Sequence, residues 1–373
     1  MKKNNTRAVV EKQLAKKEEA GPLTIGLDLG DKTSRYCVLD AQGEIYSEGS
    51  VATTRKAMGQ KFAGMRRCRI AMEVGTHSPW LSRLLSGLGY EVIVANARQV
   101  QLISASTRKN DRLDARLLAR LARVDPQLLR PIRHRGEQAQ MDLMTIRARA
   151  ELVEARTMLV NSARGLTKAS GDRLPACDTD SMGPEKMEAL PAPMREALRP
   201  LLEVVEKLSQ EIHAMDQKIE QIARSQYPET ELLEQVCGVG TLIALTFVLT
   251  IEDRQRFQKS RDVGCYVGLR PKQSESGQSQ PQLRISKEGD VYLRKLLVQG
   301  AHCILKPRAP DTDLKRWGLK LSERGGKNAK KRALVAVARK LAILLHRLWV
   351  TAEVYEPLRN SQAAARCWQK AAA

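Results

Sequence analysis

Two acids three residues apart, Asp111 and Asp114, begin the apolar-periodic segment KNDRLDARLLARL of residues 109–121. On a helix, this spacing puts both carboxylates on one face, one turn apart. Acids in a first turn also suit the helix dipole, so a capped helix start is the ordinary interpretation of such a pair. Two other acids favour a site instead, because Asp28 ends the apolar segment LTIGLD and Glu73 ends CRIAME, and both segments are expected to be buried strands.

Carboxylates that are brought together repel one another, so they need protons or cations to neutralise them. Their hard oxygen donors favour Mg²⁺ or Mn²⁺. A pair of such ions can activate the attacking oxygen and stabilise the leaving oxygen in phosphodiester cleavage. The sequence therefore predicts a divalent-metal site whose ligands are Asp28, Glu73, Asp111 and Asp114.

The chain is strongly basic: its 373 residues carry a formal net charge of +21, and the pI is near 9.9. A basic globular protein of this kind is most simply a nucleic-acid binder. Lys109, Arg112 and Arg116 stand beside the predicted acidic site, where they would suit a phosphate backbone. Aromatic residues make up only 4%, which argues against a platform of rings that stacks on single strands.

Nothing in the sequence indicates a membrane or an oxidising compartment. No apolar run is long enough to span a bilayer, and no signal peptide precedes the first expected strand. The seven cysteines are an odd number at scattered positions, without CxxC or a Cys/His spacing typical of zinc. We therefore expect a cytoplasmic protein.

The acids are expected to be positioned by an α/β domain over residues 23–135, preceded by a charged leader over residues 1–22. The segments LTIGLD, RYCVLD, EIYSEGSV, CRIAME and EVIVAN have the composition of strands, and helical segments follow the third, fourth and fifth of them. The resulting order, β-β-β-α-β-α-β-α, resembles the RNase H-like fold of RuvC-type nucleases and transposases. That resemblance implies an active site at the ends of the central strands.

Residues 136–228 are expected to be helical, with an Arg-rich first helix and a second helix near residues 194–224. Apolar residues of the second helix alternate three- and four-residue spacing, which is a heptad seam: Leu198, Leu201, Val205, Leu208, Ile212, Met215, Ile219 and Ile222. The seam could pack on the Arg-rich helix or on a second copy of the chain. We favour a helical, coiled-coil hairpin that also forms dimers.

A mostly helical C-terminal domain is expected over residues 229–350, followed by a loose tail over residues 351–373. The segment Gly238-Val239-Gly240-Thr241 looks like the glycine turn of a helix-hairpin-helix, whose backbone N–H groups face a phosphate. Taken by itself, the motif is better explained as an ordinary glycine-bearing turn.

The polar loop between Leu269 and Ile285 contains Ser274 and Ser276 in the segment QSESG. A serine can attack a phosphodiester only if a base or a metal activates its hydroxyl. The cations Arg270, Lys272 and Arg284 of this loop are candidate nucleic-acid contacts, as are Lys287 and Arg294 after it.

Six segments in order resemble the DEDD transposases of bacterial insertion sequences, the IS110 family, whose members are viewed as bridge-RNA-guided serine recombinases. They are IGLDLG, AMEVGT, KNDRLDARLLARL, GVGTLIA, YVGLRPKQSESG and ISKEGDVYLRKLL, and the match runs from Leu23 to about Trp349. The resemblance implies that the four acids are the DEDD metal ligands and that Ser276, rather than Ser274, forms a covalent link to DNA. It also implies a composite active site in which the serine loop meets the acidic domain. The stretch GQSQPQ departs from the pattern, since more Gly and Lys would be expected there.

The prediction is therefore a Mg²⁺- or Mn²⁺-dependent DNA transposase associated with the bacterial nucleoid. It is expected to act on element ends and target DNA with a guide RNA, as a homodimer or homotetramer. A RuvC-like endonuclease that uses water, without a covalent intermediate, is one alternative, and a non-catalytic nucleic-acid-binding protein is another. An actin-like ATPase is a third, because Asp28 to Thr33 also resembles a phosphate loop.

Overall fold

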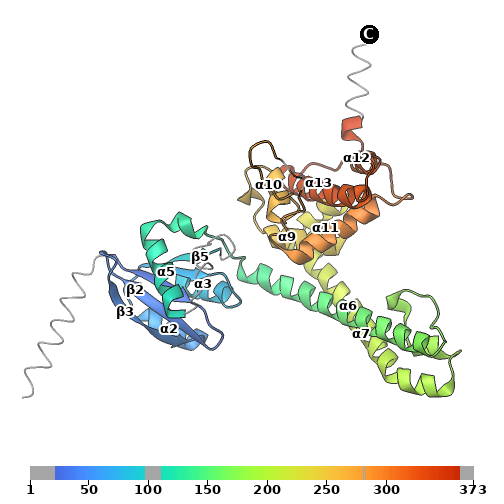
Figure 1. Cartoon of the computed structure of the whole chain (residues 1–373), viewed down its shortest axis with the longest axis horizontal. Helices are drawn as coiled ribbons and strands as arrows, with labels where there is room; N and C mark the ends of the chain where they lie inside the picture. The colour runs from blue at the N-terminus through green and yellow to red at the C-terminus, as the bar shows by residue number, and fades with distance from the viewer. Residues whose placement is uncertain (1–21, 97–110, 280, 282, 362–373) are drawn as a thin grey trace, which may run out of the picture. The chain divides into compact units, whose positions relative to one another are not determined.

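The computed structural model describes residues 22–96, 111–279, 281 and 283–361. The chain divides into two units, residues 1–137 and 138–373 (Figure 1), and each unit has its own hydrophobic core. The predicted leader, except for Pro22, lies outside the described residues, as does Lys109. Within the described ranges, no helix is long and apolar enough to cross a membrane.

The first unit has the element order that the sequence predicts. Its elements are β1 (Thr24–Asp28), β2 (Thr33–Leu39), β3 (Ile45–Ala52), α2 (Arg55–Ala63), β4 (Arg69–Glu73), α3 (Ser78–Gly87), β5 (Glu91–Ala95) and α5 (Asp111–Val124), followed by the 3-10 turn η1 (Pro126–Leu129). The strands form one mixed sheet in the order β3-β2-β1-β4-β5. β2 is antiparallel to both β1 and β3, whereas β4 is parallel to both β1 and β5.

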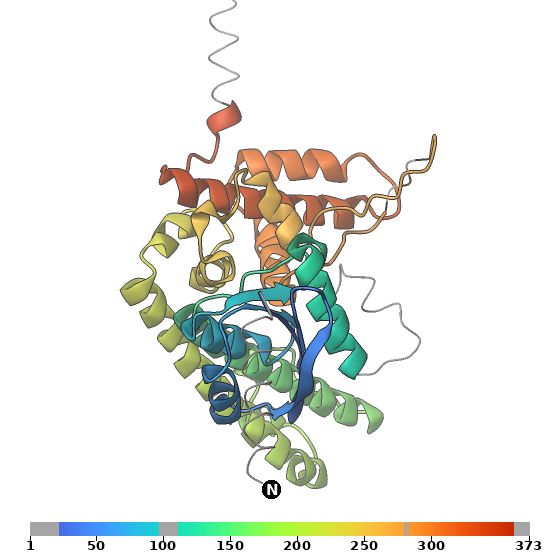
Figure 2. The same cartoon turned by 90° about the vertical axis from the view of Figure 1, so that its left-hand side faces the viewer.

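The two faces of this sheet are covered by different helices, with α5 on one face and α2 and α3 on the other (Figure 2). Since side chains alternate along a strand, Ile25 and Leu27 face α2 and α3, whereas Gly26 faces α5. A Cβ at Gly26 would overlap the carbonyl oxygen of Ala115 and approach the amide of Ala119. The glycine of IGLD is therefore needed because the helix backbone lies against the strand.

The second unit is helical within the described residues. Its elements are α6 (Glu137–Ala169), η2 (Thr179–Ser181), η3 (Pro184–Met187), α7 (Ala192–Gln226), α8 (Glu229–Glu234), α9 (Thr241–Ile251), η4 (Arg254–Arg256), α10 (Arg261–Tyr266), α11 (Val291–Ile304), α12 (Asp313–Ser322) and α13 (Ala329–Thr351). Helix α9 is buried at every position from Ile243 to Ile251, so α10, α11 and α13 can pack around it. This apolar helix forms the centre of the C-terminal core.

Helices α6 and α7 form an antiparallel hairpin (Figure 1). Ile146 and Ile219 share a cluster near its base, and Val160 and Leu202 share another farther along. Of the predicted seam, one group is buried: Leu198, Val205, Ile212, Ile219 and Ile222. The other group, Leu201, Leu208 and Met215, is half-buried. Packing within one chain thus buries the first group of seam residues and leaves the second group partly exposed. That the seam also forms dimers stays a prediction.

The glycine turn between α8 and α9 is closely packed against α11. Gly238 has a φ of +82°, and a Cβ there would lie 2.7 Å from the carbonyl oxygen of Gly300. Gly240 is the N-cap of α9. Tertiary packing therefore accounts for Gly238, and phosphate binding by this turn stays a prediction.

Candidate catalytic site and nucleic-acid contacts

Asp28 and Glu73 are the last residues of the neighbouring parallel strands β1 and β4, and both are half-buried. They directly follow the register pair Leu27 and Met72. Because residues in register on parallel strands point to the same face, the two acids project on the face that α5 covers. The strand positions predicted from the sequence thus place two carboxylates side by side.

Helix α5 runs with its first turn toward those carboxylates. Near its end, the carbonyl oxygen of Ala122 accepts a hydrogen bond of 3.0 Å from Arg69, the first residue of β4. The opposite end of the helix, which contains Asp114, therefore lies toward the carboxyl ends of the strands, where Asp28 and Glu73 are. The fold brings three of the four predicted acids to one edge of the sheet.

The fourth acid, Asp111, is the first residue of α5, but its side chain lies outside the described part of the structure. Among the residues that are described, no group of three or more His, Cys, Asp or Glu side chains is arranged to hold a metal ion. The chemistry of the donors, all carboxylates, fits a hard divalent cation. Metal binding here stays a proposal that rests on the shared edge.

Glu48 of β3 is a partner of α5, the helix that carries Asp111 and Asp114, and the sequence did not predict this contact. Arg116 binds it with two hydrogen bonds, Nε to Oε2 at 2.9 Å and Nη2 to Oε1 at 3.0 Å, and Arg112 also binds Oε1. These arginines, predicted as phosphate contacts, join the first half of α5 to the sheet. Glu48 is visible in the predicted strand EIYSEGSV, but from the sequence its carboxylate could equally have faced water.

Ser276 lies at the tip of a hairpin that we call the serine arm, of which the structure describes residues 270–279, 281 and 283–286. Near its base, Lys272 N donates to the carbonyl oxygen of Arg284 at 2.9 Å. At its tip, Ser276 and Ser279 exchange backbone hydrogen bonds of 3.3 and 3.0 Å across a two-residue turn. Gly277, the first residue of that turn, has a φ of +56°, as a tight hairpin requires. Ser276 is exposed and held next to this turn.

The predicted cations of this region fall into two groups. Arg270, Lys272 and Arg284 are exposed along the serine arm, and Lys287 is exposed at its base. Arg294 differs, because its Nη1 donates to the carbonyl oxygens of Val267 and Glu288, at 2.9 and 2.8 Å. Its guanidinium is thus engaged with the backbone of the same unit.

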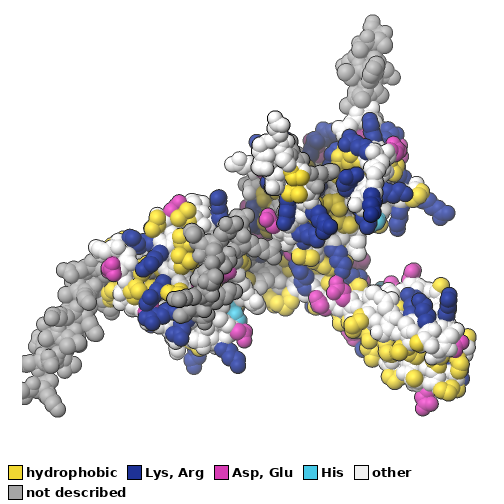
Figure 3. Space-filling model, in the orientation of Figure 1, with side chains coloured by type: hydrophobic (Ala, Val, Ile, Leu, Met, Phe, Trp, Pro, Cys, Tyr) yellow, Lys and Arg dark blue, Asp and Glu magenta, His cyan; other side chains and the backbone are white. Residues whose placement is uncertain are grey.

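The arginines of α6 are also engaged within the chain. Arg147 pairs with Asp290, Arg149 with Asp216 and Arg156 with Asp180, and Arg164 donates to the carbonyl oxygen of Cys177. The Arg-rich helix therefore uses these charges to fix the fold. Exposed cations gather instead around the turn between α12 and α13 (Figure 3): Lys320, Arg324, Lys327, Lys330, Lys331 and Arg332.

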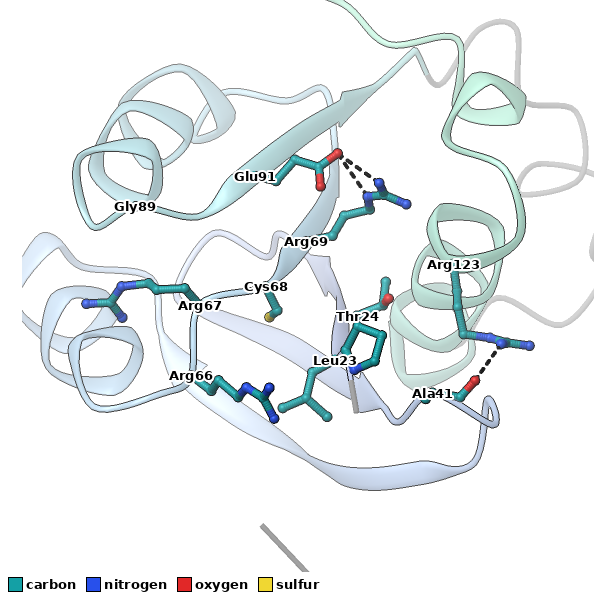
Figure 4. A pocket seen from close by; sticks show the side chains of 11 residues that line it. Leu23, Thr24, Ala41, Arg66, Arg67, Cys68, Arg69, Gly89, Glu91 and Arg123 are labelled. Atoms are coloured by element: carbon teal, nitrogen blue, oxygen red, sulfur yellow. Dashed lines mark hydrogen bonds and ion pairs between the residues drawn. The ribbon is translucent and has the colours of Figure 1, made fainter. Parts of the chain in front are cut away.

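A cavity of about 610 Å³ lies at the amino ends of the strands, at the opposite edge of the sheet from the acids (Figure 4). Its arginines are partly engaged: Arg69 pairs with Glu91 at 3.0 Å, and Arg123 donates to the carbonyl oxygen of Ala41. Burial raises the pKa of the Cys68 thiol to about 11, so this thiol stays protonated and unreactive at neutral pH. None of the predicted site residues lines the cavity.

Known proteins similar to this chain are transposases. A DEDD transposase model of the IS110 family matches residues 25–169, and the model for the transposase IS116/IS110/IS902 family matches residues 230–314. The transposase for insertion sequence element IS1111A of Coxiella burnetii is 28% identical over 339 residues, covering 89% of this chain and 90% of that protein. A probable family 20 transposase of Pseudomonas aeruginosa is 28% identical, covering 89% and 98%.

An α/β unit with acids at one sheet edge, followed by a helical unit matched by a second transposase model, defines a DNA transposase. The chain belongs to the IS110 family of insertion-sequence transposases.

Proposed function

We propose that this transposase cuts and rejoins DNA through a covalent link to Ser276, with the acids of the first unit as its second catalytic element. The observation that carries the proposal is the placement of Ser276 at the exposed tip of a hairpin, next to a turn that fixes its backbone. Such a serine is accessible to a DNA strand, whereas a structural serine would be expected to have buried partners.

The acids Asp28, Glu73, Asp111 and Asp114 would hold the cations, which we infer to be Mg²⁺ or Mn²⁺. This assignment is supported by the placement of the acids, because the carboxyl ends of β1 and β4 and the first turn of α5 lie at the same end of the sheet. When bound, such ions would supply positive charge for phosphodiester transfer. The strand order with antiparallel β2 and β3 beside parallel β1, β4 and β5 supports an RNase H-like fold for this unit.

In the covalent step, the Ser276 hydroxyl attacks a phosphorus of the DNA backbone and loses its proton. A phosphoserine bond forms as the bond to one strand end breaks, and that end leaves with a free hydroxyl. Attack by a hydroxyl of another strand then reverses the chemistry and releases the serine. Each step exchanges one phosphoester for another, so the sequence of steps needs no external energy source.

We also infer three partners. DNA is the substrate, held in part by Arg270, Lys272, Arg284 and Lys287. A guide RNA would bind the exposed cations around the α12–α13 turn, since binding to an RNA backbone depends on positive charge beside the phosphates. A second copy of the chain would cover exposed apolar residues of the α6–α7 hairpin: Met141, Met144, Met158, Leu166 and Val204. The nucleoid is the expected location because DNA is the substrate.

The test is to incubate the full chain with its element-end DNA, co-expressed element RNA and Mg²⁺, and to look for a protein–DNA adduct on a denaturing gel. Ser276→Ala should abolish the adduct, and Asp28→Asn should reduce it by at least about a hundredfold. Ser274→Ala is the matched control, because this exposed serine is two residues away on the same arm.

The outcomes separate the alternatives. Cleavage without an adduct that survives Ser276→Ala would contradict the proposal and indicate a metal-dependent nuclease that uses water. An adduct that is lost with Ser274→Ala but kept with Ser276→Ala would show that Ser274 is the nucleophile. RNA dependence is read in the same assay by omitting the RNA, and unchanged activity without it would exclude a guide.

A further inference from the structure

The base of the serine arm is a narrow crossing of two backbone segments. On one side lie Val267 and Gly268, after α10, and on the other lie Lys287, Glu288 and Gly289, before α11. Lys287 N donates to the carbonyl oxygen of Gly268 at 3.1 Å. Residues 270–279 of the arm are exposed and Ile285 packs against the C-terminal core beside the crossing, so the position of the arm is set at its base.

Two glycines make this crossing possible. Gly268 and Gly289 have φ values of +71° and +74°. A Cβ at Gly268 would overlap the backbone of Glu288, and a Cβ at Gly289 would overlap the carbonyl oxygen of Tyr266. The segments touch backbone to backbone and are joined directly by the hydrogen bond from Lys287 N to the Gly268 carbonyl oxygen, to which a side chain can add a further link.

Arg294 is the side chain that joins the two segments. It lies one turn into α11, and its Nη1 donates to the carbonyl oxygen of Val267 at 2.9 Å and to that of Glu288 at 2.8 Å. One nitrogen thus bridges the first and second segments of the crossing. Charge-assisted hydrogen bonds of this kind are stronger than neutral ones.

The start of α11 is itself fixed from outside the arm. The Asp290 side chain caps the helix by accepting from Leu293 N at 2.8 Å, and it also pairs with Arg147 of α6 at 2.5 Å. One turn later, Lys295 pairs with Glu154 of α6 at 2.8 Å. Arg294 therefore projects from a helix end that is joined to α6 both before it, at Asp290, and after it, at Lys295. This placement suits a positioning role.

We propose that Arg294 is a positioning residue for transposition: by bridging the carbonyl oxygens of Val267 and Glu288, it sets where the serine arm presents Ser276. The alternative role, the phosphate contact predicted from the sequence, is tested against it by the variants below. The inference rests on the proposed function of Ser276, and the bridge itself is tested independently of that function.

The geometry predicts that lysine cannot replace Arg294. Lysine keeps the charge, but its ammonium is a compact point charge on a different stem and does not reproduce guanidinium geometry. A phosphate contact, by contrast, would be largely retained by lysine. The Arg294→Lys and Arg294→Gln variants therefore distinguish the two roles.

The first measurement is amide hydrogen exchange of the full-length protein without DNA. In both variants, peptides that cover residues 267–269 and 286–289 should exchange about tenfold faster than in the wild type, since the bridge is a charged hydrogen bond. Peptides from α9 and α13 should be unchanged. Arg308→Lys is the control, because Arg308 is exposed in the same unit and forms no hydrogen bond within the described residues.

Unchanged exchange at the base in both variants would overturn the bridge. Faster exchange throughout the C-terminal unit would overturn it too, because Arg294 would then support the whole fold and not the arm. Only faster exchange confined to the base supports the proposal.

The second measurement is single-turnover adduct formation beside DNA binding, with Ser276→Ala in parallel. Arg294→Lys should lower the adduct rate by about tenfold or more while the dissociation constant for DNA changes by less than about twofold. Weaker DNA binding with Arg294→Gln that lysine restores would instead establish a phosphate contact. An adduct that persists in Ser276→Ala would refute the proposed nucleophile and leave the exchange result to decide the bridge.

Discussion

Two residues of the sheet, Gly26 and Glu48, position α5, the helix that carries Asp111 and Asp114. Gly26 lets the helix backbone lie against β1, and Glu48 of β3, on the same face of the sheet, binds Arg112 and Arg116 of the helix. Neither residue is one of the four predicted metal ligands. Both are expected to matter because a shift of about 1 Å in catalytic groups lowers activity strongly.

Gly26→Ala should destabilise the first unit by about 1–3 kcal/mol, the usual cost of overpacking, because the added methyl overlaps the Ala115 carbonyl. Urea denaturation measures this change. The control is Gly59→Ala in α2, where a Cβ meets nothing within 4 Å, so alanine should be neutral or stabilising by about 0.5–1 kcal/mol. Equal effects of the two substitutions would contradict the close packing of α5.

Glu48→Gln should weaken the contact between β3 and α5. The Glu48 side chain is only 19% exposed, so its coupling to Arg116 should be about 1 kcal/mol, at the upper end for ion pairs near a surface. A double-mutant cycle with Arg116→Gln measures it. The control is the same cycle for Glu91 and Arg69. Because the Glu91 side chain is 59% exposed, the coupling free energy of this pair should be smaller. A coupling near zero for Glu48 would refute its role.

At the scale of elements, α13 supports the C-terminal core and buries a histidine. His346 is 1% exposed, with Nδ1 3.0 Å from the Ser260 hydroxyl and Nε2 3.0 Å from the Arg254 carbonyl oxygen. The Nε2 group must donate to that carbonyl, so Nδ1 accepts from the serine. Burial lowers the pKa of His346, and this outweighs the opposite effect of the Arg254 carbonyl.

The lowered pKa of His346 predicts a pH-dependent stability. Below the unfolded pKa of about 6.5, the unfolded chain binds more protons than the folded one. The contribution is therefore full above about pH 6.5 and is lost as the pH falls toward the lowered folded pKa. Thermal unfolding of wild type and His346→Asn between pH 5 and 8 should show a difference that shrinks on acidification. The exposed His302, changed to Asn, serves as control, and a constant difference for His346 would contradict the prediction.

At the scale of the whole molecule, the acids and the serine belong to different units, residues 1–137 and 138–373. Each unit has its own core, so each is expected to fold when produced alone. Neither should form a covalent adduct with DNA by itself, and a mixture of the two should recover at most a small part of the activity. Circular dichroism and the adduct gel measure these outcomes. Adduct formation by residues 138–373 alone would show that the acids are not needed.

The sequence determined the order of elements in the first unit and the ends of β1 and β4 at Asp28 and Glu73. These features are local, because apolar runs and their periodicity fix strands and helices within a few residues. The family relationship was also readable from segments spread along the chain. Ser276 before a turn glycine was readable in the same way, since turns have strong residue preferences.

Only the tertiary structure decided what the charged side chains contact. Arg116 meets Glu48 from a distance of 68 residues along the chain, and Arg294 bridges two carbonyl groups. An arginine in a sequence suits phosphate, carboxylate or carbonyl oxygen equally well, because all three accept hydrogen bonds from guanidinium. Which acceptor it finds depends on packing between distant segments. For the same reason, the need for glycine at Gly26 became clear only when α5 was seen against β1.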